Sequence, residues 1–292
     1  MEVAATEAEA DAAIVLADGA VGTIGAERLA RAKNLGWLQS HQAAPPADYY
    51  HAALVRHPLV VTNMRGIFND HIGAHVMACV LAFARGLHIY LPQQARREWK
   101  PQPPDTGVIP LPESTMLIVG LGGIGSEIAR LAKAFGMTVL ATDTRRTAKP
   151  AVADEMHPPE ALDALLARAD FVVLTVPRTP ATEGLMHRAR LRRMRRGAFL
   201  INIGRGMTTR LVDLAEALRA GELAGAALDV FEVEPLPPES PLWTMPNVLV
   251  TPHIAGYGPH LDERRYAIIR DNCRAMLAGT ALCNVVDKAA WF

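Results

Sequence analysis

The sequence is poor in the features that mark secreted, membrane-bound or nucleic-acid-binding proteins. Its 292 residues include three cysteines without a C-x-x-C pair, which argues against a disulfide framework and a zinc knuckle. Thirty basic and thirty acidic residues cancel, so no net field attracts nucleic acid or an anionic membrane. The first residues lack the basic start and apolar middle of a signal peptide, and no apolar run approaches the ~20 residues that span a bilayer. We therefore expect a cytoplasmic protein without nucleic-acid or membrane partners.

What the sequence does contain is a regular alternation of strand and helix patterns after residue 115. Apolar runs predict strands at 115–120, 136–143, 170–176, 198–204, 224–230 and 247–253, and helical patterns predict helices at 124–135, 159–169, 187–196 and 211–221. The strand runs are apolar throughout, which is typical of a parallel sheet covered on both faces. Repeated strand–helix–strand units predict an α/β fold with a doubly wound, Rossmann-type sheet.

The first 90 residues are less regular. Segments 11–19, 35–40 and 59–63 are predicted strands, and 70–85 is a predicted long, apolar helix. The polar, proline-rich segment 91–107 is predicted to connect two domains.

Two clusters allow both a functional and a structural interpretation. His71 and His75 are four residues apart, as metal ligands on a helix can be, but the H-E-x-x-H pattern needs glutamate where Ile72 stands. Packing is the better interpretation, and no metal site is predicted. The six arginines between 188 and 196 suggest nucleic acid, but the neutral overall charge favours a solvated helix face.

A glycine motif lies between the predicted strand 115–120 and the helix that follows it. Gly120, Gly122 and Gly125 form G-x-G-x-x-G in the strand–turn–helix context of a dinucleotide site. Such a turn brings backbone N–H groups and the positive end of a helix to a pyrophosphate. The motif therefore predicts a dinucleotide cofactor.

The next strand ends at Asp143, 23 residues beyond Gly120. A carboxylate there can accept hydrogen bonds from ribose hydroxyls and repel a 2′-phosphate, which favours NAD. The neighbouring Arg145 and Arg146 leave NADP open, because arginine at this place is typical of a 2′-phosphate site.

Three further residues follow predicted strand ends: Arg205 in INIGRG, Glu234 in LDVFEVEP and His253 in TPHIAG. Because the carboxyl ends of parallel strands converge on one crevice, these side chains can meet although they are far apart in sequence. A histidine can exchange a proton near neutral pH, and an arginine can hold a carboxylate with two hydrogen bonds.

The sequence resembles the D-isomer-specific 2-hydroxyacid dehydrogenase family through several motifs in the same order. They are the glycine motif, Asp143, INIGRG, ALDVFEVEPLP and TPHIAG. The resemblance runs from about Leu117 to the C-terminus and is looser in the first third. It implies that His253 is the catalytic acid and base, that Glu234 orients it, and that Arg205 anchors the substrate carboxylate.

The resemblance also implies a cofactor site and a domain division. The residues expected at the cofactor are Gly120, Gly122, Gly123, Ile124, Gly125, Asp143, Val176, Pro177, Thr182, Ile203, Gly204, Asp229, His253 and Gly256. Asp229 would hold the nicotinamide carboxamide. The expected domains are a smaller, flavodoxin-like substrate domain at 1–92, completed by 265–292, and a dinucleotide-binding domain at 93–264. A homodimer, formed through the helix that follows Asp70, is also implied.

Several segments depart from the family pattern. The N-terminal domain is expected to be shortened, since residues 2–19 already resemble the family's second strand, its loop and its third strand. The substrate loop reads SHQAAPPADYY, in which Pro45 and Pro46 offer no N–H groups to a carboxylate. Ala74 replaces the glutamate usual before a histidine, and Arg65 is a candidate for an added positive charge near the pocket.

The function predicted from these residues is hydride transfer between NAD(H) and a small 2-oxo or D-2-hydroxy acid such as glyoxylate or hydroxypyruvate. A cofactor-sensing protein or corepressor on the same fold is the alternative, motivated by the altered loop. Glu234 argues against a formate dehydrogenase, which has glutamine in that role, and a phosphoglycerate dehydrogenase stays open.

Overall fold

The computed structural model describes residues 3–104, 108–146 and 148–290, and the chain divides into two compact units. The larger unit spans Phe68–Tyr257, and the smaller unit combines the chain up to Ile67 with the chain from Gly258 onward. These boundaries differ from those predicted at 92 and 264.

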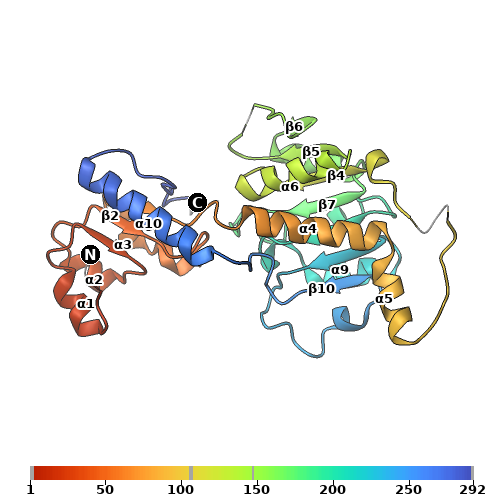
Figure 1. The fold of residues 1–292 in the computed structure, drawn as a ribbon, viewed down its shortest axis with the longest axis horizontal. Helices are drawn as coiled ribbons and strands as arrows, with labels where there is room; N and C mark the ends of the chain where they lie inside the picture. The colour runs from red at the N-terminus through yellow and green to blue at the C-terminus, as the bar shows by residue number, and fades with distance from the viewer. Residues whose placement is uncertain (1–2, 105–107, 147, 291–292) are drawn as a thin grey trace. The chain divides into compact units, whose positions relative to one another are not determined.

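The larger unit is built on a seven-stranded parallel sheet (Figure 1). Its strands are β4 (Thr115–Val119), β5 (Thr138–Thr142), β6 (Glu155–His157), β7 (Phe171–Leu174), β8 (Phe199–Asn202), β9 (Gly225–Leu228) and β10 (Val248–Val250). They lie in the order β10-β9-β8-β7-β4-β5-β6, all parallel. The chain runs outward from β4 in one direction and then in the other, which makes the β4–β7 boundary the topological switch point of a Rossmann-type sheet.

Helices cover both faces of this sheet. They are α4 (Asn69–Ala84), α5 (Leu87–Ala95), α6 (Gly123–Ala134), α7 (Leu162–Leu166), α8 (Arg188–Leu191) and α9 (Leu211–Arg219). Alternate residues of β4 enter two different cores: Ile118 joins the cluster with α4 and α6, and Leu117 joins the cluster with α7, α8 and α9. A strand buried on both faces has to be apolar throughout, as the sequence pattern predicted.

The boundary at Phe68 has a packing cause. α4 lies beside α6 (Figure 1), and Gly73 lets the two helices approach so closely that a Cβ there would meet Glu127 at 3.0 Å and Leu131 at 3.1 Å. Val76 and Val80 of α4 are fully buried in the same core as Ile128 of α6. Residues 68–92 therefore belong to the larger unit by their contacts, although they were predicted within the substrate domain.

Every strand and helix predicted after residue 115 is present, with some changes in extent. The helix predicted at 187–196 is only α8, and β6 was missed because its three residues are half-buried and not strongly apolar. α5 occupies the start of the predicted connection 91–107, of which residues 105–107 lie outside the described residues. The arginines around α8 form ion pairs, such as Arg190 Nε with Asp163 at 2.7 Å and Arg188 Nη2 with Glu222 at 3.1 Å.

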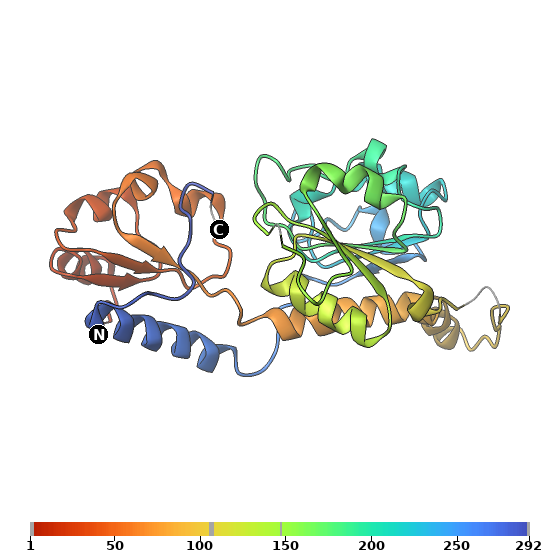
Figure 2. The same cartoon turned by 90° about the horizontal axis from the view of Figure 1, so that it is seen from above.

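The smaller unit contains a three-stranded parallel sheet. Its elements are α1 (Glu7–Ala13), β1 (Gly19–Val21), α2 (Ala26–Arg31), β2 (Trp37–Gln39), α3 (Ala52–Arg56), β3 (Val60–Thr62) and α10 (Leu261–Ala278). The strand order is β1-β2-β3. Figure 2 shows α10 running beside this sheet, where Asn272 Nδ2 donates to Gln39 Oε1 at 2.9 Å. The C-terminal segment thus completes this unit.

The prediction of a strand at 11–19 is wrong. Residues 7–13 form α1, whose first turn is capped by the Thr6 hydroxyl accepting from the Glu9 N–H at 3.2 Å. Acidic Glu7 and Glu9 in that turn suit the positive end of the helix dipole. The strand β1 begins only at Gly19. The reading of residues 2–19 as a strand, loop and strand is therefore wrong as well.

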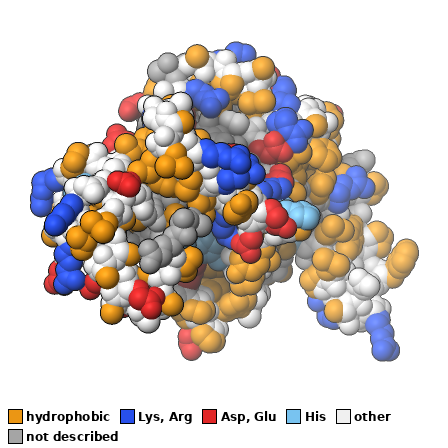
Figure 3. Space-filling model, turned by 60° about the vertical axis from the view of Figure 1, so that its left-hand side comes forward, with side chains coloured by type: hydrophobic (Ala, Val, Ile, Leu, Met, Phe, Trp, Pro, Cys, Tyr) orange, Lys and Arg blue, Asp and Glu red, His pale blue; other side chains and the backbone are white. Residues whose placement is uncertain are grey.

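The surface charges and the hydropathy of the helices can be compared with the expectations from the composition. On the face seen in Figure 3, basic and acidic side chains are interspersed. Among the described residues, no single helix has both the length and the apolar composition to cross a membrane. α4 and α5 reach that length and composition together, but they meet at a bend of 74°.

Candidate active site

The glycine turn joins β4 to α6 at the switch point of the sheet. Gly120 has φ +99°, which favours glycine, and its N–H donates to Thr142 O at 2.8 Å. A Cβ on Gly125 would lie 2.2 Å from the carbonyl oxygen of Gly120, so only glycine permits this approach of helix to strand. A Cβ on Gly122 would meet nothing within 4 Å. The turn is therefore tightly packed beneath and open above, as a pyrophosphate cradle needs.

Asp143, at the end of β5, is tied to this turn. Its Oδ2 accepts from the Leu121 N–H at 2.9 Å, and its Oδ1 accepts from the N–H groups of Arg145 at 2.8 Å and Arg146 at 3.1 Å. These bonds fix the carboxylate beside the glycine turn. The side chains of Arg145 and Arg146 are exposed.

The turns after β7 and β8 pack against each other, at the same edge of the sheet as the glycine turn. A Cβ on Gly204 would lie 2.7 Å from Val176 O, so glycine is needed where these turns meet. The Thr182 hydroxyl donates to Pro177 O at 2.6 Å and closes the turn after β7. Ile203 is 7% exposed, and its side chain packs in the core.

The remaining glycine-motif residues and Gly256 have packing roles of their own. Ile124 is half-buried against the core, and a Cβ on Gly123 would meet the Asn69 side chain at 2.8 Å. Gly256 lies against the ring of Phe68: a Cβ on Gly256 would be 3.3 Å from Phe68 Cδ1.

Arg205 projects from the turn after β8. The Asn202 side chain holds this turn, accepting from the Gly204 N–H at 3.1 Å and donating to Arg205 O at 3.2 Å. Arg205 Nη1 donates to Gly204 O at 2.6 Å. Burial lowers the pKa of Arg205, and the nearby Glu234 carboxylate raises it. Arginine stays charged, so a largely desolvated cation is held in place here.

Glu234 and His253 form a hydrogen-bonded pair. His253 Nδ1 lies 2.7 Å from Glu234 Oε2, and Glu234 Oε1 accepts from the Phe231 N–H at 2.9 Å. The nearby Glu232 has a different partner: it accepts from the Leu211 N–H at the start of α9, at 2.9 Å. His253 has φ +54°, an uncommon backbone conformation for a residue other than glycine.

The predicted catalytic residues Arg205, Glu234 and His253 therefore come together in the larger unit. Gly206 reinforces this, since a Cβ there would lie 1.9 Å from the Phe231 backbone, which means that the Arg205 turn packs directly on the segment leading to Glu234.

Asp229, after β9, is 2% exposed and faces the segment that carries His253. Its carboxylate accepts from the Thr251 hydroxyl at 2.6 Å and from the N–H groups of Ile254 and Ala255, both at 2.9 Å. The sequence pattern had suggested only a cofactor contact for Asp229. Thr251 and Asn202 were missed, although both are polar residues at the ends of predicted apolar strands, which is a usable signal.

The predicted substrate loop belongs to the smaller unit, as does Arg65. Asn63 Nδ2 donates to Ala43 O at 2.9 Å, and Arg65 Nη2 donates to Val285 O at 2.8 Å. Arg65 thereby ties the C-terminal segment to this unit. The pocket contact expected of it stays a prediction.

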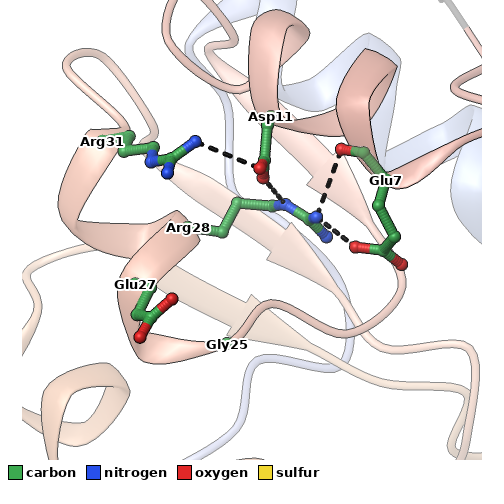
Figure 4. A pocket seen from close by; sticks show the side chains of 6 residues that line it. All are labelled: Glu7, Asp11, Gly25, Glu27, Arg28 and Arg31. Atoms are coloured by element: carbon green, nitrogen blue, oxygen red, sulfur yellow. Dashed lines mark hydrogen bonds and ion pairs between the residues drawn. The ribbon is translucent and has the colours of Figure 1, made fainter.

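The smaller unit also has a charged hollow of about 340 Å³ between α1 and α2 (Figure 4). Arg28 pairs there with Glu7 and, at 2.7 Å, with Asp11, which also pairs with Arg31 at 3.1 Å. Arg28 and Arg31 are thus paired with carboxylates of α1 inside the hollow. In the described part of the chain, no group of three or more histidine, cysteine or acidic residues is placed to hold a metal ion.

The sheet order, the glycine cradle at its switch point and the gathered Arg205, Glu234 and His253 define a dinucleotide-binding oxidoreductase. Residues 77–255 match the family model of the D-isomer-specific 2-hydroxyacid dehydrogenases, NAD-binding domain. The chain belongs to this family, whose members are NAD(P)-dependent oxidoreductases. The predictions of family, fold class and enzyme type are therefore confirmed.

Similar proteins and solved structures support the same family assignment. The chain is 36% identical to glyoxylate/hydroxypyruvate reductase B of Serratia proteamaculans over 240 residues, which are 80% of this chain and 73% of the relative. It resembles a D-isomer-specific 2-hydroxyacid dehydrogenase of Xanthobacter autotrophicus in complex with NADPH (TM-score 0.83, 32% identity, 94% of this chain and 84% of that one). It also resembles an NADPH-dependent glyoxylate/hydroxypyruvate reductase of Sinorhizobium meliloti in complex with NADP (TM-score 0.81, 29% identity, 94% and 86%).

Proposed function

We propose that this protein reduces a small 2-oxo acid, such as glyoxylate or hydroxypyruvate, to the corresponding hydroxy acid with a nicotinamide dinucleotide, and catalyses the reverse oxidation. The observation that carries the proposal is the hydrogen bond of 2.7 Å between His253 and Glu234, beside the desolvated Arg205. A 2-oxo acid needs a cation for its carboxylate and a proton donor for its keto oxygen, and these residues offer both.

Arg205 is the proposed carboxylate anchor. Its bond to Gly204 O and the Asn202 bonds around the turn restrict the guanidinium before a substrate arrives. A restricted, poorly hydrated cation loses little entropy and little hydration when it pairs with a carboxylate. Holding the carboxylate also places the adjacent keto carbon, and such positioning contributes much of an enzyme's rate.

His253 is the proposed acid and base. Its Nδ1 is engaged with Glu234 Oε2, which accepts a hydrogen bond and so fixes the proton on Nδ1. Nε2 is then the nitrogen that gives a proton to the keto oxygen during reduction and takes it back during oxidation. The Glu234 carboxylate orients the ring through this hydrogen bond.

The residues of the glycine turn fit a dinucleotide. Gly122 is open where a pyrophosphate would approach, and the N-terminus of α6 supplies N–H groups and a positive dipole end. Asp229 Oδ2 accepts one hydrogen bond, from the Ala255 N–H, and has capacity for a second from a nicotinamide carboxamide. When bound, the nicotinamide supplies the hydride.

NAD is the proposed cofactor, and NADP is the alternative. The Asp143 carboxylate beside the glycine turn disfavours a 2′-phosphate, whereas exposed Arg145 and Arg146 favour it. Structural neighbours of this chain were solved with NADP or NADPH. Both cofactors therefore belong in any assay.

The proposal includes a cytoplasmic homodimer. Leu87 and Leu91 of α5 are 44% and 60% exposed, and Trp99 is 96% exposed. Exposed large apolar side chains of this kind are a feature of interfaces. α4, the helix expected there, buries Val76 and Val80 within its own unit, which makes α5 the better candidate. Light scattering should give twice the mass of one chain.

A panel of 2-oxo acids assayed with NADH and NADPH tests the function. We expect turnover of at least one of glyoxylate, hydroxypyruvate or a longer 2-oxo acid. Binding of a dinucleotide without turnover of any member would favour the alternative, a cofactor-sensing protein with the altered loop SHQAAPPADYY. Failure to bind either cofactor would contradict both.

A further inference from the structure

The segment that carries His253 is held from two sides. On one side, Asp229 accepts hydrogen bonds from the N–H groups of Ile254 and Ala255, which directly follow His253. On the other side, Thr251 donates its hydroxyl proton to Asp229 at 2.6 Å. The carboxylate therefore grips the chain before and after a residue whose φ is +54°.

A histidine from α4 extends this network. His75 Nε2 lies 3.3 Å from Thr251 Oγ1 and 4.0 Å from Asp229 Oδ1, and its side chain is 18% exposed. The mechanism proposed above does not use this side chain. His71, one turn earlier on the same helix, has a buried Nε2 with no hydrogen-bond partner within the described residues.

The protonation of His75 follows from the chemistry of its neighbours. A carboxylate has no proton, so the short contact with Asp229 takes the single hydroxyl proton of Thr251. Thr251 Oγ1 can then only accept from His75, and His75 Nε2 must carry a hydrogen. The order of donation is thus His75 to Thr251 to Asp229.

The groups around Asp229 indicate that a donor such as His75 stabilises its carboxylate. Asp229 is 2% exposed, and the donors that reach it within hydrogen-bond distance are a hydroxyl and two backbone amides, all neutral. Cys79, one turn beyond His75, faces the same carboxylate, and its pKa is raised to about 11 by burial and by the charge of Asp229. A further N–H donor stabilises a buried carboxylate and makes the Thr251 bond stronger.

We propose that His75 is a positioning residue, which donates from Nε2 to Thr251 and so holds the Asp229 network and the His253 segment in its working conformation. The kinetic part of this inference rests on the proposed 2-oxo acid reduction, whereas the protonation and segment order do not.

The test compares three variants of the 292-residue chain. His75→Leu removes the donor at similar volume, and His75→Gln keeps an N–H donor. His71→Leu is the matched control, since it removes a histidine of the same helix whose Nε2 has no such partner. We expect kcat to fall about tenfold in His75→Leu, as for loss of one hydrogen bond. His75→Gln should recover most of kcat, and His71→Leu should resemble the wild type.

Two readouts do not depend on activity. Long-range ¹H–¹⁵N NMR of the wild type, assigned with His75→Gln, should give the Nε2–H form of His75. Hydrogen exchange of the Ile254 and Ala255 amides should be faster in His75→Leu and near normal in His75→Gln.

An Nδ1–H form of His75, unchanged exchange in His75→Leu, or equal losses in His75→Leu and His75→Gln would overturn the inference. If His75→Leu does not fold, the NMR form of the wild type and the His75→Gln kinetics decide it. If the wild type reduces no 2-oxo acid, the proposed function fails, and the protonation and exchange results still decide this inference.

Discussion

The two units use the same parallel β–α arrangement at different scales. In the larger unit, the central strands β4 and β5 have five residues each, and both faces of the sheet have their own buried cluster. In the smaller unit, each strand has three residues, and one cluster forms the core. Arg205, Glu234 and His253 follow the ends of strands in the doubly covered sheet, whereas the smaller unit includes α10 from the chain's end.

The largest expected effect on the free energy of unfolding comes from replacing one buried leucine in each core by alanine. Leu117 of β4 is 0% exposed and Leu38 of β2 is 1% exposed, so Leu117→Ala and Leu38→Ala should each cost about 2–5 kcal/mol. A smaller unit has a smaller unfolding entropy, so the same cost should move its midpoint by about 4–8 °C per kcal/mol, against about 2–4 °C in the larger unit.

Differential scanning calorimetry with and without NADH checks this. We expect Leu38→Ala to lower a transition that NADH leaves unchanged, and Leu117→Ala to lower the transition that NADH raises. A single transition, shifted equally by both substitutions, would contradict the division into two units of different stability.

A glycine from each unit sharpens the comparison. A Cβ at Gly125 would lie 2.2 Å from Gly120 O, so Gly125→Ala should cost about 1–3 kcal/mol and weaken NADH binding at least about tenfold. Gly25 caps α2 with φ −76° and has open space around it, so Gly25→Ala should change stability by less than about 1 kcal/mol. Fluorescence titration of NADH and urea unfolding measure both effects. Equal NADH affinity in Gly125→Ala and the wild type would contradict the role given to the turn.

The contrast between the units also explains what the sequence could predict. Continuous apolar runs such as Met116–Val119 are readable because burial on both faces leaves no place for polar residues. Gly120, Gly125, Arg205 and His253 were found because their motifs sit at the ends of such runs. In the smaller unit, three-residue strands give too short a pattern. The segment 11–19 was predicted as a strand, whereas residues 7–13 form α1, a helix capped by Thr6.

The Asp229 network was not predictable for a different reason. The contact between His75 and Thr251 joins residues 176 positions apart and depends on how α4 packs on the sheet. Sequence spacing suggests that His75 lies on a helix face, but it does not indicate which strand end that face meets.

The smallest effect should come from the ion pairs at the edge of each unit. At β6, hydrogen bonds from Arg168 and His157 lower the pKa of Glu155 from 4.5 to about 2, and in the smaller unit Arg28 lowers the pKa of Asp11. A depressed carboxyl pKa stabilises the fold above pH ~4.5, and this contribution is lost as the pH falls toward about 2.

Glu155→Gln should therefore lower stability at pH 6 by at most about 1 kcal/mol, because the pair is solvent-screened, and the difference should shrink as the pH falls to 3. Urea midpoints across this pH range measure it, with the exposed Glu160→Gln as control. A difference that grows as the pH falls would contradict the sign.

The most direct test of the whole account is the turnover of His253→Gln at saturating NADH and 2-oxo acid. Glutamine keeps a polar side chain but cannot exchange a proton near neutral pH. We predict that kcat falls by about a hundredfold or more, while the Kd for NADH stays within about twofold of the wild type. Unchanged turnover in His253→Gln would contradict the claim that Arg205, Glu234 and His253 form one catalytic group beside the glycine turn.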